Sequence, residues 1–242
     1  MAIPLAGLQK VSLIDYPGHI CAIAFLQGCN MRCPYCHNAV LVPCEYEAQE
    51  VYQQRQETLL AYLAKNKGLI EGLCITGGEP TLFNELPSFI EAVKDLGFKV
   101  KLDTNGTNPE QFKKLLDKRL LDYIAMDIKT SLSNYDRVGI TSELLIERIK
   151  QSIELIKTSD LEYEFRTTLE PNTVKKEDIE LMGQDIKGAK KWIFQAYRPD
   201  IVLKREDVSS YSYSPQEAED MLEIARQFVE FASLRGYAVA VH

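Results

Sequence analysis

Residues 28–38 read Gly28-Cys29-Asn30-Met31-Arg32-Cys33-Pro34-Tyr35-Cys36-His37-Asn38. Three cysteines fall within eight positions, a spacing at which their thiolates can ligate three corners of a cubane 4Fe–4S cluster. An electron-transfer cluster takes four cysteines, whereas a metal site that does chemistry leaves one coordination position open for its substrate. The stretch therefore predicts a reactive cluster bound by Cys29, Cys33 and Cys36, with one iron free to bind a ligand.

The chain has three further cysteines. Cys21 and Cys74 lie in short apolar runs, so we expect both to be small hydrophobic residues of buried strands. Cys44 follows Cys36 by eight residues and has no assigned role. The alternative is a non-catalytic iron–sulfur carrier in which Cys44 is a ferredoxin-type fourth ligand.

Length and charge restrict the class of protein. A chain of 242 residues matches an α/β barrel folded as one domain. Its net charge of −7 argues against nonspecific binding to nucleic acid or to an anionic membrane. No apolar run reaches the roughly 20 residues of a membrane span, and the first residues lack the pattern of a secretory signal. These features predict a cytoplasmic protein.

Apolar runs of strand length alternate with helical patterns, which is typical of βα units in a parallel sheet. Strands are expected near 20–26, 72–76, 98–103, 122–128, 162–169 and 191–196. Helices are expected near 46–66, 86–96, 109–118, 142–157, 175–183 and 215–234. The last helix has a capping box formed by Ser214 and Glu217, and Gly236 follows its predicted end. One domain over 1–242 is predicted, with a lead-in at 1–19 and a covering loop at 198–214.

Three of the predicted strands carry mostly polar side chains at every second position. These positions are Lys99, Lys101, Asp103 and Asn105; Tyr123, Ala125, Asp127 and Lys129; and Glu162, Glu164, Arg166, Thr168 and Glu170. Because the opposite faces are apolar and would pack on helices, the polar faces are expected to line the concave side of the sheet. Ordinary barrels fill this interior with branched apolar residues. A charged interior therefore predicts a polar ligand there.

Polar motifs follow the strands at the carboxyl end of the predicted sheet, where ligand sites of parallel α/β folds gather. After the cysteine loop come Thr76-Gly77-Gly78-Glu79-Pro80, then Leu102-Asp103-Thr104-Asn105-Gly106, then Asp127-Ile128-Lys129. The two glycines lack the Cβ atoms that would keep a ligand from the backbone. Each motif alone also fits a plain turn or an internal salt bridge.

Together and in this order, these motifs resemble those of the radical S-adenosylmethionine superfamily over most of the chain. An N-terminal run, Leu8-Gln9-Lys10-Val11-Ser12-Leu13-Ile14-Asp15-Tyr16-Pro17-Gly18, extends the resemblance to activating enzymes of glycyl-radical enzymes. The best specific match is to the activating proteins of anaerobic ribonucleotide reductases. The resemblance implies a partial (β/α)6 barrel similar to a TIM barrel, with a parallel sheet and outer helices.

The resemblance also implies a 4Fe–4S cluster and S-adenosylmethionine as cofactors. Glu79 and the backbone of Gly77 and Gly78 would receive the methionine ammonium group. The methionine carboxylate or the ribose would be contacted by residues at several strand ends, and a monovalent cation could accompany them. The implied binding residues are Tyr35, His37 and Asn38 for the adenine, and Asp103, Thr104, Asn105, Asp127, Lys129, Arg166, Gln195 and Arg198 for the rest of the molecule. Arg198 stands where the activating enzyme of formate lyase has histidine.

The implied reaction is reductive cleavage of S-adenosylmethionine to methionine and a 5′-deoxyadenosyl radical, which then takes a hydrogen atom from a glycine Cα of a partner. The implied partners are a glycyl-radical enzyme, expected to be an anaerobic ribonucleotide reductase, and a reductant of the flavodoxin or ferredoxin type. The expected partners include neither nucleic acid nor a membrane. A radical enzyme that acts on a small metabolite or nucleobase would share every motif and is the main alternative.

Overall fold

The computed structural model describes residues 1–200, 202–203 and 205–237. In this part of the chain eight strands form one sheet in the order β1-β2-β3-β4-β5-β6-β7-β8. The strands are β1 (Leu5–Ser12), β2 (Cys21–Leu26), β3 (Gly72–Gly77), β4 (Lys99–Thr104), β5 (Tyr123–Asp127), β6 (Glu162–Leu169), β7 (Lys191–Ala196) and β8 (Phe231–Arg235). β1 runs antiparallel to β2, and every other neighbouring pair is parallel.

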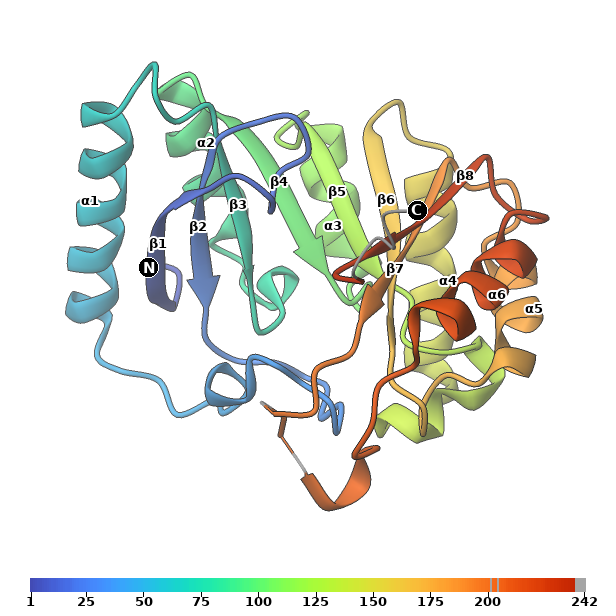
Figure 1. Ribbon diagram of the computed structural model, residues 1–242. Helices are drawn as coiled ribbons and strands as arrows, with labels where there is room; N and C mark the ends of the chain where they lie inside the picture. Colours follow the sequence, from blue (N-terminus) through green and yellow to red (C-terminus); the bar gives the residue numbers. More distant parts are fainter. Residues whose placement is uncertain (201, 204, 238–242) are drawn as a thin grey trace.

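Within the described residues, six α-helices cover the outer side of the curved sheet (Figure 1). They are α1 (Gln49–Lys65), α2 (Leu86–Asp95), α3 (Pro109–Asp117), α4 (Glu143–Lys157), α5 (Lys176–Asp185) and α6 (Pro215–Ala225). β1 and β8 are not paired with each other within the described residues, so the sheet is an open barrel. None of the described helices combines the length and apolar character needed to span a membrane.

The main core lies between the sheet and the helices. It contains the outward residues of the strands, such as Leu73, Val100 and Ile124, all fully buried. Trp192, the one tryptophan of the chain, is also fully buried, and its Nε1 donates to Thr167 Oγ1 at 2.9 Å. The apolar halves of the strand patterns thus pack on the helices, which leaves the polar halves to face the inside of the barrel.

The inner side has its own small apolar cluster at the amino-terminal end of the strands. Tyr16 lies there with Cys21, Ile23, Cys74 and Tyr123, all almost completely buried. Tyr16 comes from the loop between β1 and β2 and packs against Tyr123, with ring centroids 5.9 Å apart. The expectation that Cys21 and Cys74 are buried residues of strands is confirmed, although they belong to this inner cluster and not to the main core.

The six predicted strands are confirmed as β2 to β7. The five predicted helices that lie between them in the chain are confirmed within a few residues as α1 to α5. Two strands were not predicted. β1 occupies the middle of the 1–19 lead-in, and β8 overlaps the end of the predicted helix 215–234. That helix was predicted wrongly beyond Ala225, because the chain turns there and 231–235 pairs in parallel with β7. The apolar spacing of this segment fits either structure, and strand pairing decides between them.

Two long loops lie at the carboxyl end of the parallel strands, at the bottom of Figure 1: the loop after β2 and the segment after β7. The second contains much of the predicted covering loop 198–214. Its described part is held to the sheet by Glu170, whose fully buried carboxylate accepts the Ser209 N–H at 2.8 Å. Tyr197 Oη also donates to the Ser209 carbonyl at 3.1 Å. Strand ends and loops together therefore enclose one end of the barrel.

Candidate active site

A cavity of about 380 Å3 occupies the inside of the barrel near the carboxyl ends of the strands. This volume lies within the usual range for small-molecule sites. All but two of the predicted site residues line it. The lining includes Cys29, Cys33, Cys36, Tyr35, His37, Asn38, Gly77, Gly78, Asp103, Thr104, Asn105, Asp127, Lys129, Arg166 and Gln195. Glu79 and Arg198 are not among the lining residues.

The three cysteines of the 28–38 loop face this cavity together. No three metal-binding side chains in the described part of the chain are placed to hold one metal ion. A 4Fe–4S cluster needs a different arrangement, because each thiolate binds a separate iron atom. The Met31 N–H donates to Cys29 Sγ at 3.4 Å, the kind of bond that tunes a cluster's potential. Burial raises the pKa of the Cys29 thiol. It also raises the pKa of the Cys33 thiol, to about 12, so iron binding must release protons.

Gly77 and Gly78 shape the wall beside the cysteines. Gly77 has a φ of +119°, which favours glycine, and a Cβ there would lie 2.4 Å from the Leu26 backbone. A Cβ on Gly78 would lie 1.9 Å from the carbonyl oxygen of Gly28. The sequence predicted that these glycines expose the backbone to a ligand. In the structure, both positions need glycine because the backbone at the end of β3 lies so close to the backbone at the end of β2.

Glu79 has partners within the chain. Its fully buried carboxylate accepts bonds from Thr104 Oγ1 at 2.8 Å and from the Asn105 N–H at 2.6 Å. It also accepts the N–H and the hydroxyl of Thr81 at 3.0 and 2.5 Å. Burial raises its pKa although these bonds oppose the shift. Glu79 therefore fastens the end of β3 to the end of β4, and binding of an ammonium group there stays a prediction.

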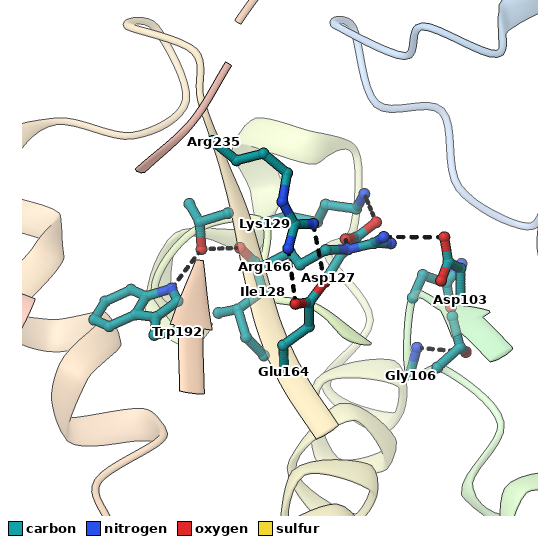
Figure 2. A network of polar contacts seen from close by, with 12 residues as sticks. Asp103, Gly106, Asp127, Ile128, Lys129, Glu164, Arg166, Trp192 and Arg235 are labelled. Atoms are coloured by element: carbon teal, nitrogen blue, oxygen red, sulfur yellow. Dashed lines mark hydrogen bonds and ion pairs between the residues drawn. The ribbon is translucent and has the colours of Figure 1, made fainter. Parts of the chain in front are cut away.

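Five charged side chains on β4, β5 and β6, and just after β5, form what we call the charged layer, and all but Lys101 line the cavity. They are Lys101, Asp103, Asp127, Lys129 and Arg166. Arg166 bridges the two carboxylates: its Nη1 lies 2.9 Å from Asp103 Oδ2 and its Nε lies 2.9 Å from Asp127 Oδ1 (Figure 2). Lys129 Nζ lies 2.8 Å from the other oxygen of Asp127. Lys101 Nζ bonds the other oxygen of Asp103.

The charged layer holds its carboxylates ionised. Burial alone would raise the pKa of Asp127, but Arg166 and Lys129 outweigh it and lower the pKa to about 2. Burial likewise opposes the ionised form of Asp103, and Arg166 and Lys101 lower its pKa. Arg166 and Lys129 have raised pKa values because the same carboxylates outweigh their burial. The inside of the barrel is therefore charged near neutral pH.

The cysteine loop is tied to the strand ends around it. Asn38 Nδ2 donates to the Gly77 carbonyl at 3.2 Å. His37 Nε2 lies 3.2 Å from the Arg198 carbonyl, and its ring stacks near Tyr197 with centroids 6.3 Å apart. The Arg198 side chain itself is exposed, so only its backbone meets the site. The phenol of Tyr35 is buried in the cavity wall, and its oxygen has no hydrogen-bond partner among the described residues.

Some residues of the site were not singled out from the sequence. Lys101 was recognised only as one of many polar strand positions, yet its side chain completes the charged layer. Asn30 and Thr107 were not identified at all. Asn30 accepts from Asn105 Nδ2 at 3.0 Å and donates to Thr107 Oγ1 at 2.8 Å, which links the cysteine loop to the end of β4. The alternation of polar residues on β4 was the one signal that pointed to Lys101.

The protein-family model of the radical S-adenosylmethionine (radical SAM) superfamily matches residues 23–184 of the sequence. The chain therefore belongs to that superfamily. A putative glycyl-radical enzyme activating enzyme of Methanocaldococcus jannaschii is 30% identical over 235 residues, which cover 96% of this chain and 95% of the relative. The pyruvate formate-lyase-activating enzyme of Clostridium pasteurianum is 30% identical over 128 residues, 51% of each chain. Within the superfamily, the chain is thus one of the activating enzymes of glycyl-radical enzymes.

The fold agrees with this assignment. The crystal structure of Streptococcus suis SuiB bound to the precursor peptide SuiA has a TM-score of 0.64 at 16% identity. The match covers 88% of this chain and 48% of that chain. Membership implies a 4Fe–4S cluster and S-adenosylmethionine. The cavity fits such groups, because it joins three cysteines, charged side chains that no apolar ligand would need, and a buried phenol. Among the described residues, the oxygen of this phenol has no hydrogen-bond partner.

Replacing Gly78 with alanine tests the close contact of β2 and β3. The new Cβ would lie 1.9 Å from the Gly28 carbonyl oxygen, so the backbone must move. We expect the free energy of unfolding of the cluster-free protein to fall by about 2 kcal/mol or more, measured by chemical denaturation. Gly7→Ala is the control, because its Cβ would meet only Phe25 at 3.9 Å. Equal stability of the two variants would contradict the predicted contact.

Replacing Asp127 with asparagine tests the charged layer through pH. Because folding lowers the pKa of Asp127 from 3.8 to about 2, this carboxylate stabilises the fold above about pH 4 and loses its effect as pH falls toward 2. The shift corresponds to about 2 kcal/mol. Denaturation curves of the wild type should show this loss over that range, and Asp127→Asn should lack it. Parallel pH profiles of the two proteins would mean that Asp127 is not held ionised by its partners.

Proposed function

We propose that this chain activates an anaerobic ribonucleotide reductase by forming a glycyl radical on it. The observation that carries this proposal is the extent of the cavity. Its lining includes the three cysteines of the cluster loop and also Asp15, from the N-terminal run that resembles the reductase activators. A site that joins the cluster loop to this run suits a peptide segment of a partner better than a small molecule alone.

The chain's own residues would bind and orient the cofactors. Cys29, Cys33 and Cys36 would ligate the cluster, and the backbone near Tyr35, His37 and Asn38 would meet the adenine. When bound, the cluster and S-adenosylmethionine supply one-electron cleavage of a carbon–sulfur bond and, from it, abstraction of a hydrogen atom. Lys129 and Arg166 would hold the methionine carboxylate, and Gln195 would contact the ribose. The buried walls would keep water from this chemistry.

Three finer points belong to the proposal. The electron donor would be a flavodoxin or ferredoxin, since the cluster must be reduced by one electron at a time. The reaction would take place in the cytoplasm. The resemblance also implied a monovalent cation beside Asp103, Thr104 and Asp127. Each of the two carboxylates already has two cationic partners within the chain, so the proposal includes no such ion.

A spectroscopic assay tests the proposal. Anaerobic mixing of reconstituted and reduced enzyme, S-adenosylmethionine and a candidate reductase should give a glycyl-radical doublet by electron paramagnetic resonance. The matched control is the same reductase with its radical-bearing glycine changed to alanine, which should give no doublet. Cofactor cleavage without a doublet would reject the reductase as partner while keeping the chemistry. A cluster whose spectrum ignores S-adenosylmethionine would reject both.

A further inference from the structure

Lys101 is the most deeply buried member of the charged layer. Its residue exposure is 1%, and it lies on β4 two residues before Asp103, on the same face of the strand. Its Nζ bonds Asp103 and contacts Cys74 Sγ at 3.7 Å. Cys74 belongs to the apolar inner cluster, which contains no carboxylate. Burying an ammonium group in such a place is costly unless its charge is used.

The charges of this layer do not cancel. Three cations, Lys101, Lys129 and Arg166, face two carboxylates, Asp103 and Asp127, which leaves one unbalanced positive charge. The nearby Glu164 does not remove it, because Arg235 pairs with that carboxylate at 2.9 and 3.0 Å (Figure 2). The methionine part of S-adenosylmethionine carries one carboxylate. The excess charge of the layer is therefore equal in size and opposite in sign to the charge of the group proposed to bind there.

We propose that Lys101 is a positioning residue for S-adenosylmethionine. Lys101 neutralises Asp103, so that Arg166 and Lys129 keep one free positive charge for the methionine carboxylate. In this chain Lys101 does the work of a bound monovalent cation, so cofactor binding needs no such ion. The inference rests on the proposed placement of S-adenosylmethionine in the cavity. Lys101 does not line that cavity and acts only through Asp103.

The charge count makes a specific prediction for two variants. Lys101→Met keeps a side chain of similar length but leaves the layer neutral, and it frees an oxygen of Asp103 for a cation. Lys101→Met combined with Asp103→Asn restores the excess charge, because one cation and one carboxylate are lost together. Lys118→Met is the matched control. Lys118 is exposed and pairs with Glu91 at 2.8 Å, and neither residue lines the cavity.

The experiment measures binding of radiolabelled S-adenosylmethionine to each reconstituted protein by anaerobic equilibrium dialysis. Buffers contain tetramethylammonium chloride alone, or the same ionic strength with potassium or sodium chloride. Thermal unfolding of each cluster-free protein is recorded beside it. The wild type and Lys118→Met should bind equally well in all three buffers. Lys101→Met should bind about tenfold more weakly without potassium or sodium and recover when either is added.

Without added cation, the double variant should bind about threefold or more tighter than Lys101→Met, because it regains the excess positive charge. Three results would overturn the inference: a wild type that requires potassium or sodium, a Lys101→Met variant that binds normally in tetramethylammonium chloride, or a folded double variant as weak as the single one. The first needs no variant, so it applies even if Lys101→Met fails to fold. If the wild type takes up a cluster but binds no S-adenosylmethionine in any buffer, the proposed function fails instead.

Discussion

The ion bridge made by Arg166 is the interaction on which the inside of this barrel depends. A guanidinium at this depth is stable only because two carboxylates meet it, one from β4 and one from β5. Arg166 pairs with Asp127 in the sheet register, so the bridge also fixes how β5 and β6 lie against each other. A shift by one residue would move every charge to the helix side. The charged interior and the strand register are therefore one constraint.

The second constraint joins the loops at the carboxyl end into one unit. Glu79 connects β3 to β4 through bonds to Thr104 and the Asn105 backbone, and Asn105 in turn reaches Asn30 in the cysteine loop. Glu79, Thr104 and Asn105 are buried polar residues with hydrogen-bond partners in the chain, which makes these contacts costly to separate. The walls of the cavity are thus held by hydrogen bonds between loops that are far apart in sequence. A preformed cavity follows, into which cofactors can enter without large rearrangement.

Much of the fold followed from the sequence because the strand patterns from β2 to β7 are unambiguous. The alternation on β4, β5 and β6 predicted a charged interior, and the structure places Asp103, Asp127 and Arg166 there. The two edge strands could not be predicted in the same way. The segment around Ala232 has apolar spacing that suits a helix as well as a strand, and only its pairing with β7 distinguishes them. Side-chain destinations such as that of Glu79 also depend on tertiary contacts that no local pattern encodes.

The close passage of Gly78 over Gly28 has a consequence for how this protein can change over time. Glycine codons differ from one another only in their third base, so any substitution in the first two bases introduces a side chain or a stop signal. At Gly78 every such side chain would begin with an atom 1.9 Å from a backbone oxygen. Natural variation at this crossing is therefore limited to silent changes unless both loops are rebuilt together. The wall beside the cluster should stay the same while the outer helices drift.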